Sequence, residues 1–172
     1  MSKPCYRNVI DQLGLLDHLA KFDPVVIGTP PLGIATENSD IDIACSSLDL
    51  NAFVAVATKR FGQFNGFEIL NIENLNEPAI VVKFNALDWE IELFCQNLST
   101  AKQWGVRHFY IEQRLLALDP ELVGKVTLLK QNGMKTEPTF AQLLALQGDP
   151  YEAMLDLETY SDIELINLIS KR

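Results

Sequence analysis

Two short segments in which polar and apolar residues alternate constrain the fold of this chain more than any other feature. The first, DIDIACS at residues 40–46, carries carboxylates at Asp40 and Asp42 with Ile41 and Ile43 after each of them. Successive side chains of a β-strand point to opposite faces, so both carboxylates are expected on one face and both isoleucines on the other. The pattern predicts a strand with one buried face.

The second segment, WEIELFC at residues 89–95, repeats this arrangement. Here Glu90 and Glu92 are expected to share one face of a strand. The opposite face would carry Trp89, Ile91, Leu93 and Cys95. If the two strands lie near each other, the acids of the second can join Asp40 and Asp42.

Carboxylates held close together repel one another, and a plain surface strand gives no reason to pair them. A divalent cation does, because Mg²⁺ is a hard ion that prefers oxygen ligands and neutralises their charge. The four acids of the two strands therefore indicate a metal site.

The loop that precedes the first acidic strand is rich in glycine and proline. Gly28 ends an apolar segment and allows the backbone to approach a ligand closely, and Thr29 offers a hydroxyl and a backbone N–H to a phosphate. Proline at 30 and 31 fixes the course of the loop, Gly33 permits another tight turn, and Ser39 directly precedes the acids. Gly28, Thr29 and Ser39 are therefore the candidate nucleotide-binding residues.

The remaining elements follow from hydrophobic periodicity and from turn residues. Helices are expected over residues 6–22 and 50–61, and strands over 25–28, 40–46, 67–72, 79–84 and 89–95, of which the last two form a hairpin through the turn NALD. After Ser99 the pattern is helical, with helix starts at Ser99, Asp119, Asp149 and Ser161. The sequence predicts an α/β (α+β) fold with a mixed sheet over residues 1–98 and a helical segment over residues 99–172, the two possibly forming one continuous domain.

Composition excludes several classes of protein. The 172 residues carry a net charge of −9, which argues against nonspecific binding to nucleic acid or to an anionic membrane, because both need a cationic surface. The three cysteines are far apart, so neither a disulfide framework nor a CxxC zinc site is indicated. No apolar run has the length of a signal peptide core or a membrane span, and we expect a cytoplasmic protein.

The loop and the acidic strand together resemble the signature of the nucleotidyltransferase (polymerase-beta-like) superfamily. In that signature an apolar residue, glycine and a small residue precede a loop, which leads to an acid–apolar–acid–apolar strand; here Gly28-Thr29 leads to Asp40-Ile41-Asp42-Ile43. The segments SDIDI, WEIELF, HFYIEQRLL and KTEPTFAQLLALQGDPYEAMLDL are together similar to a family of functionally uncharacterised bacterial proteins assigned to this fold.

The resemblance implies a site that binds Mg²⁺ or Mn²⁺ and uses a nucleoside triphosphate such as ATP. The implied metal ligands are Asp40, Asp42 and a third acid, for which we prefer Glu92, deep in its strand, to Glu90, which is next to the turn. The proton of the acceptor hydroxyl would go to Glu90 or Asp42. One departure is that Leu32 stands where many superfamily members carry a basic residue just before the loop glycine.

Other residues that could carry chemistry are interpreted as structural. His108 lies at helical spacing with apolar residues, which predicts a hydrogen-bonded core histidine. The adjoining polar stripe is interpreted as a solvated helix face, and the aromatic residues of the helical half as core, although both could contact a substrate. The stripe consists of Gln103, Arg107, Tyr110 and Arg114, and the aromatic residues are Trp104, Phe109 and Tyr151.

The function predicted from the sequence is transfer of a nucleoside monophosphate from a nucleoside triphosphate to the hydroxyl of an acceptor that the sequence does not identify. The alternative is a catalytically inactive module of the same fold that binds a nucleotide or a protein partner, which Leu32 favours. A third possibility, a metal-independent acid–base enzyme using paired carboxylates, has no further support in the chain.

Overall fold

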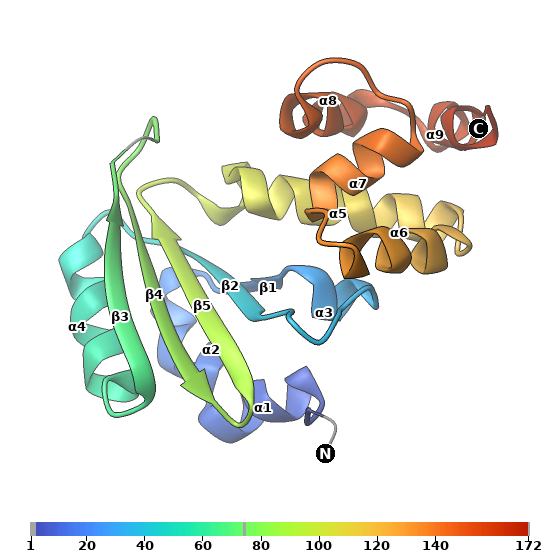
Figure 1. Ribbon diagram of the computed structural model, residues 1–172. Coiled ribbons are helices and arrows are strands. Elements are labelled where there is room, and N and C mark those ends of the chain that lie inside the picture. Colours follow the sequence, from blue (N-terminus) through green and yellow to red (C-terminus); the bar gives the residue numbers. More distant parts are fainter. Residues whose placement is uncertain (1–2, 74, 172) are drawn as a thin grey trace. The chain divides into compact units, whose positions relative to one another are not determined.

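The computed structural model describes residues 3–73 and 75–171 (Figure 1). It divides into two compact units, one formed by Met1–Pro30 and Ser39–Val106 and the other by Pro31–Asn38 and Arg107–Arg172. No helix of the described part of the chain is both long enough and apolar enough to cross a membrane.

The first unit is built on a five-stranded mixed sheet. Its strands are β1 (Val25–Ile27), β2 (Ile41–Ser46), β3 (Asn65–Ile72), β4 (Ala79–Ala86) and β5 (Trp89–Gln96). They lie in the order β1-β2-β5-β4-β3; β2 and β5 are parallel and every other pair is antiparallel. The mixed sheet confirms the predicted fold class.

Helices cover one face of this sheet (Figure 1). They are α1 (Tyr6–Leu13), α2 (Leu15–Leu19), the 3₁₀ turn η1 (Ala20–Phe22) and α4 (Leu50–Phe61). Phe22, Phe53 and Phe61 from these helices pack in one cluster with Ile43 and Leu93 of the sheet. Burial of this apolar surface is what holds the helices to the sheet and leaves the other face of the sheet available for polar groups.

Several boundaries differ from those that the sequence predicts. The expected helix over residues 6–22 is interrupted at Gly14, whose φ of 58° lies in the left-handed region and ends α1. A short helix, α3 (Thr29–Leu32), occupies the start of the proline-rich loop. Strand β2 begins at Ile41, so Asp40 precedes the strand.

The β4–β5 hairpin is tighter than the expected four-residue turn. Ala86 pairs with Trp89, which leaves only Leu87 and Asp88 between the strands, with φ of 51° and 64°. Positive φ at both central residues is the conformation of a type I′ turn, which suits the twist of a hairpin. This turn fixes which residues of β4 and β5 face each other.

The second unit is helical. Its elements are the larger part of α5 (Trp104–Leu118), then α6 (Leu122–Gln131), α7 (Thr136–Leu143), α8 (Pro150–Asp156), the 3₁₀ turn η3 (Leu157–Thr159) and α9 (Asp162–Ser170). The caps predicted at Asp149 and Ser161 are confirmed: each side chain accepts backbone N–H groups, and Ser161 forms a capping box with Glu164. The start of α7 at Thr136 was not predicted, since no side chain caps it.

Candidate functional site

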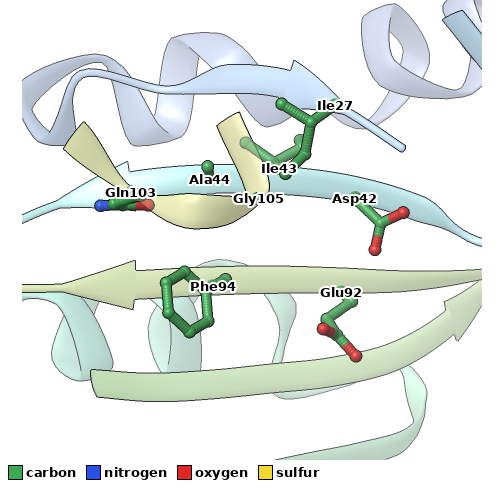
Figure 2. Close-up of a pocket in the computed structure, with 8 residues that line it drawn as sticks. All are labelled: Ile27, Asp42, Ile43, Ala44, Glu92, Phe94, Gln103 and Gly105. Carbon is green, nitrogen blue, oxygen red and sulfur yellow. The ribbon is translucent and has the colours of Figure 1, made fainter. Parts of the chain in front are cut away.

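A row of charged side chains crosses the open face of the sheet. Asp42 of β2 stands opposite Glu92 of β5 in the parallel pair, and Glu92 stands opposite Lys83 of β4 in the antiparallel pair. Figure 2 shows the side chains of Asp42 and Glu92 projecting from neighbouring strands on the same side of the sheet. Two acids distant in the sequence are thus brought together by the strand register.

The alternation predicted for the two strands explains why these acids face outward. Ile41 and Ile43 are each 1% exposed, and Ile91 and Leu93 are each 0% exposed. All four belong to the core beneath the helices. Their burial fixes the face of each strand, because a shift of one residue would exchange the acids with the core.

Gly28 lies directly against one of these acids. The residue has φ of 78°, and a β-carbon at this position would stand 2.1 Å from Asp42 Oδ2. A side chain of any other amino acid would therefore collide with the carboxylate as well as strain the backbone. The glycine of the loop is required by the carboxylate beside it.

Asp42 is the group of this site whose ionisation is most perturbed. The pKa of its carboxyl is raised to about 8, first by burial and then by the negative charges of Asp40 and Glu92 and a hydrogen bond with Asp40, against an opposing effect of Lys83. Like charges and a dry environment both disfavour the carboxylate form. A cation placed beside Asp42 would therefore favour the ionised form of its carboxyl group.

Lys83 supplies the positive charge nearest to the acids. Its Nζ lies 2.6 Å from Glu92 Oε2 and 3.8 Å from Glu90 Oε1. The hydrogen bond to Glu92 raises the pKa of Lys83 above its ordinary value. The sequence analysis missed this residue, although a two-residue turn at Leu87 and Asp88 would have placed it opposite Glu92 by counting along the hairpin.

Glu90 occupies the rim of the site. Its side chain is 50% exposed, whereas that of Glu92 is 26% exposed, and it pairs with Asn85 near the turn of the hairpin. Of the two glutamates, only Glu92 faces Asp42 across the strand pair.

The two hydroxyl residues at the ends of the loop contact each other. Thr29 Oγ1 and Ser39 Oγ are 2.9 Å apart, and both residues are buried. Lys3 donates a hydrogen bond of 3.0 Å to the backbone oxygen of Ser39. The hydroxyl pair holds together the two ends of the segment between Gly28 and Asp40.

The oxygen donors at this site match the preference of Mg²⁺ and Mn²⁺. Three carboxyl groups lie close together here, since Asp40 is hydrogen-bonded to Asp42 and Glu92 is paired with Asp42. Across residues 3–73 and 75–171, however, no three Asp, Glu, His or Cys side chains are already arranged to hold an ion. Lys83 is paired with Glu92, so a cation at this site would compete with the lysine for that carboxylate.

A cavity of about 210 Å³ opens beside the acids (Figure 2). It is lined by Ile27, Asp42, Ile43, Ala44, Glu92, Phe94, Gln103 and Gly105. All of these residues belong to the first unit.

The structural interpretation of His108 is confirmed. The residue is 3% exposed, and its Nε2 lies 2.9 Å from the backbone oxygen of Tyr151. Arg107 and Arg114 of the polar stripe form ion pairs with Glu158 and Asp162, at 2.9 Å and 2.7 Å from the Nε of each arginine.

Two residues of these groups differ from the expectation. Gln103 precedes α5 and is 1% exposed, so it is not on a solvated helix face. Trp104 is 51% exposed and is not part of the core, whereas Phe109 is 6% exposed.

The cysteines of the two acidic strands are buried, which raises the pKa of both Cys45 and Cys95.

Solved structures that include two RNA terminal uridylyl transferases share this fold. The chain is similar to the RNA terminal uridylyl transferase Cid1, with a TM-score of 0.55 and 15% identity over 87% of this chain and 46% of that chain. It is also similar to a cytoplasmic RNA terminal U-transferase, with a TM-score of 0.52 and 18% identity over 83% of this chain and 40% of that chain. A third match is a structure of the GLD-2/RNP-8 complex, with a TM-score of 0.52 and 16% identity over 81% of this chain and 55% of that chain.

These matches establish a nucleotidyltransferase-like fold, and the chain spans about half the length of the proteins it resembles. No curated protein matches the sequence. A family model does: residues 8–157 match the family described as "Domain of unknown function (DUF4269)", and the chain belongs to that family.

Proposed function

We propose that the protein is a Mg²⁺- or Mn²⁺-dependent nucleotidyltransferase that moves a nucleoside monophosphate from a nucleoside triphosphate to an acceptor hydroxyl. The observation that carries this proposal is the pairing of Asp42 with Glu92 across two parallel strands, with the side chain of Asp40 hydrogen-bonded to that of Asp42. The similarity to Cid1, one structure of which is bound to MgATP and another to MgGTP, supports the same reading.

In this reaction the acceptor oxygen forms a bond to the α-phosphorus, and the bond from that phosphorus to the oxygen of the leaving pyrophosphate breaks. The metal, held by Asp40, Asp42 and Glu92, would neutralise phosphate charge and favour the deprotonated acceptor. The displaced proton passes to a carboxylate, for which Asp42 and Glu90 remain the two candidates.

The chain's other residues have distinct roles in this proposal. Gly28 leaves room for the carboxylate of Asp42 and would bring the backbone of the loop close to the phosphates, and Thr29 and Ser39 hold the loop and would offer hydroxyl groups to the nucleotide. Lys83 would leave Glu92 free to hold the metal, and its positive charge would then face the phosphates. The lysine would thereby supply the positive charge that Leu32 does not bring to the loop.

A second candidate function is a catalytically inactive module that binds a nucleotide or a protein partner. The observation that favours it is the 2.6 Å contact between Lys83 and Glu92, which neutralises one of the acids internally. An arrangement of this kind could replace the metal permanently.

One experiment separates the two functions. ATP, GTP and UTP are titrated calorimetrically into the protein with and without Mg²⁺, and transfer of an α-³²P-labelled nucleotide is followed in parallel. The proposed enzyme binds a nucleotide only with the metal, and Asp42→Asn removes both binding and transfer. Nucleotide binding that needs no metal and survives Asp42→Asn, without any transfer, would establish the inactive module.

A further inference from the structure

The N-terminal arm of the chain, residues 3–5, contacts the two strands that carry the acids of the site. Lys3 Nζ donates a hydrogen bond of 3.0 Å to the backbone oxygen of Ser39, the residue directly before Asp40. The same ammonium group lies 4.5 Å from the centre of the Trp89 ring, at the start of β5. A cation at this distance is attracted by the electron-rich face of an indole ring. One side chain thus joins the approach to β2 and the first residue of β5.

A second contact joins the arm to Trp89. The indole Nε1 donates a hydrogen bond of 2.9 Å to the backbone oxygen of Pro4. The ring is 6% exposed and belongs to the core cluster, so packing fixes its orientation as well. The arm needs little ordering, because proline fixes its own φ and restricts the residue before it, Lys3, to an extended conformation. In Figure 1 the N-terminal residues and the β4–β5 turn lie at the same end of the sheet.

The two residues that Lys3 joins occupy equivalent places before the first pair of the β2–β5 ladder. Ile41 of β2 is paired with Ile91 of β5, and Ser39 and Trp89 each lie two residues earlier in the sequence. Because the two strands are parallel, both places are at the same end of the sheet. Lys3 therefore fixes the start of β2 relative to the start of β5.

Asp40 is the acid of the site that depends most on such a contact. It lies one residue before β2, whereas Asp42 and Glu92 are paired with each other within the sheet. The backbone directly before Asp40 is that of Ser39, whose oxygen accepts the hydrogen bond from Lys3. The position of the Asp40 carboxyl group therefore depends on contacts made by its neighbour, since no strand pairing holds it.

We infer that Lys3 is a positioning residue for the metal site: it holds the backbone before Asp40, so that this carboxyl group stays beside Asp42 and within reach of a divalent ion. Lys3 acts without contacting the ion, because it approaches β5 at Trp89, whose ring lies in the core, on the face of the strand opposite to Glu92. The inference rests on the proposed function, in which the three acids hold the metal.

The sign of the effect on metal affinity distinguishes positioning from simple electrostatics. Removal of a positive charge near carboxylates should by itself strengthen the binding of a divalent cation. If Lys3 positions Asp40, its removal should weaken binding, because only molecules with Asp40 in place bind the ion with full affinity. A fall of this fraction to about one tenth would weaken binding about tenfold, which corresponds to about 1.4 kcal/mol. Lys83 contacts Glu92 itself, so its removal should have the opposite effect.

Calorimetric titration of Mn²⁺ into the full chain is the first test. Lys3→Met removes the ammonium group from a side chain of similar length and should weaken Mn²⁺ binding about tenfold. Lys3→Arg keeps a charged donor that can stack on an indole ring and should stay within about threefold of the wild type. The matched control is Lys21→Met, since Lys21 Nζ lies 4.8 Å from the ring of Phe22. This variant loses the same charge and a similar ring contact, and it should bind Mn²⁺ as the wild type does.

The indole N–H of Trp89 gives a second readout that needs no metal. The chain contains two tryptophans, so Trp104→Phe leaves the Trp89 indole as the one tryptophan signal in an NMR spectrum. In this background Lys3→Met should release the bond to Pro4 and speed exchange of the indole hydrogen about fivefold through local opening. Lys21→Met should not change it. Added Mg²⁺ should slow the exchange when Lys3 is present and not in Lys3→Met, because coupling between two sites is reciprocal.

The outcomes separate this inference from the proposed function. Equal or tighter Mn²⁺ binding by Lys3→Met would overturn the inference and leave the proposed function standing, and so would weaker binding with unchanged indole exchange. Absence of Mn²⁺ binding in the wild type would reject the proposed function and, with it, the role of Lys3 towards a metal, whatever the indole exchange. Urea unfolding shows whether the variants are folded under these conditions, and Lys3→Gln replaces Lys3→Met should the latter be unfolded.

Discussion

A β-carbon on Gly28 would stand 2.1 Å from Oδ2 of Asp42, so the carboxylate of Asp42 fills the space that a side chain at position 28 would need. Gly28 directly follows β1, whose last residue, Ile27, is paired with Asp42 of β2. The left-handed backbone of residue 28 and the close approach of Asp42 therefore each require glycine at this position.

Gly28→Ala should destabilise the protein by about 2–4 kcal/mol, since it combines a left-handed backbone with overpacking against a carboxylate. The matched control is Gly33→Ala, because Gly33 has φ of 75° but open space around its β-carbon position, and it should cost only about 1–2 kcal/mol. Urea unfolding measures both. Equal losses would show that the collision with Asp42 contributes nothing, and relief of the excess in Gly28→Ala/Asp42→Gly would prove that it does.

Asp42→Asn should stabilise the metal-free protein at pH 8 but not at pH 4. The pKa of Asp42 is raised to about 8 in the folded protein, so folding favours its protonated form. This contribution to stability is complete below the ordinary pKa of 3.8 and is lost as the pH rises toward 8. The melting temperature of the variant should exceed that of the wild type by roughly 5 °C at pH 8, the scale of about 2 kcal/mol for a chain of this size. A constant difference between pH 4 and pH 8 would contradict the titration.

Leu93→Ala and Glu92→Gln should separate scaffold from site within one strand. Leu93 is 0% exposed in the core, and its truncation should cost about 2–5 kcal/mol. Glu92→Gln loses a partly exposed pair with Lys83 and should change stability by less than about 1 kcal/mol, while it weakens binding of Mg²⁺. Urea unfolding and metal titration measure the two effects. If Glu92→Gln unfolds the protein and Leu93→Ala does not, the core face and the site face of β5 have been exchanged in this assignment.

Lys83→Gln should bind Mg²⁺ more tightly than the wild type and nucleotide more weakly. The lysine contacts Glu92 at 2.6 Å and competes with any cation for this carboxylate, but in the proposed function its charge also attracts phosphates. A gain of about tenfold in Mn²⁺ affinity, measured by calorimetry, corresponds to about 1.4 kcal/mol. Lys59→Gln on α4 is the control for the loss of one positive charge and should leave Mn²⁺ affinity unchanged. Weaker Mn²⁺ binding by Lys83→Gln would mean that the lysine supports the metal site.

Glu112→Gln should stabilise the helical unit at pH 7. Glu112 is 4% exposed, its Oε1 has no hydrogen-bond partner, and burial followed by the charge of Glu137 raises its pKa well above the ordinary value. The cost of ionising this group is absent below pH 4.5 and grows as the pH rises. A gain of about 1–3 kcal/mol is expected at pH 7 and little at pH 4. Glu121→Gln, at an 83% exposed side chain, should stay within about 0.5 kcal/mol in thermal unfolding at either pH.

Residues whose role depends on local periodicity could be predicted from the sequence. The alternation in β2 and β5 predicted which side chains are buried, because a strand has only two faces. Helix α4 and the caps at Asp149 and Ser161 were predicted for the same reason, since their signals lie within a few residues.

Residues whose role depends on register or on distant contacts could not be predicted in this way. Lys83 enters the site only because the hairpin turns over two residues, and neither Leu87 nor Asp88 is a glycine that would have indicated this turn. Gln103 fits helical spacing, but its side-chain amide is buried because it donates hydrogen bonds to the backbone oxygens of Cys45 and Leu98. Such partners lie far apart in the chain or depend on packing, and periodicity carries no information about them.

The parallel pairing of β2 with β5 also determines when during folding the site can form. The strands β3 and β4 lie between them in the chain, so the contact of Asp42 with Glu92 closes a long loop and brings two acids together against their repulsion. Nonlocal contacts of this kind slow folding, and this contact brings charged groups together. The refolding rate of this protein should therefore depend on pH and on the concentration of divalent ions, because both change the repulsion between these acids.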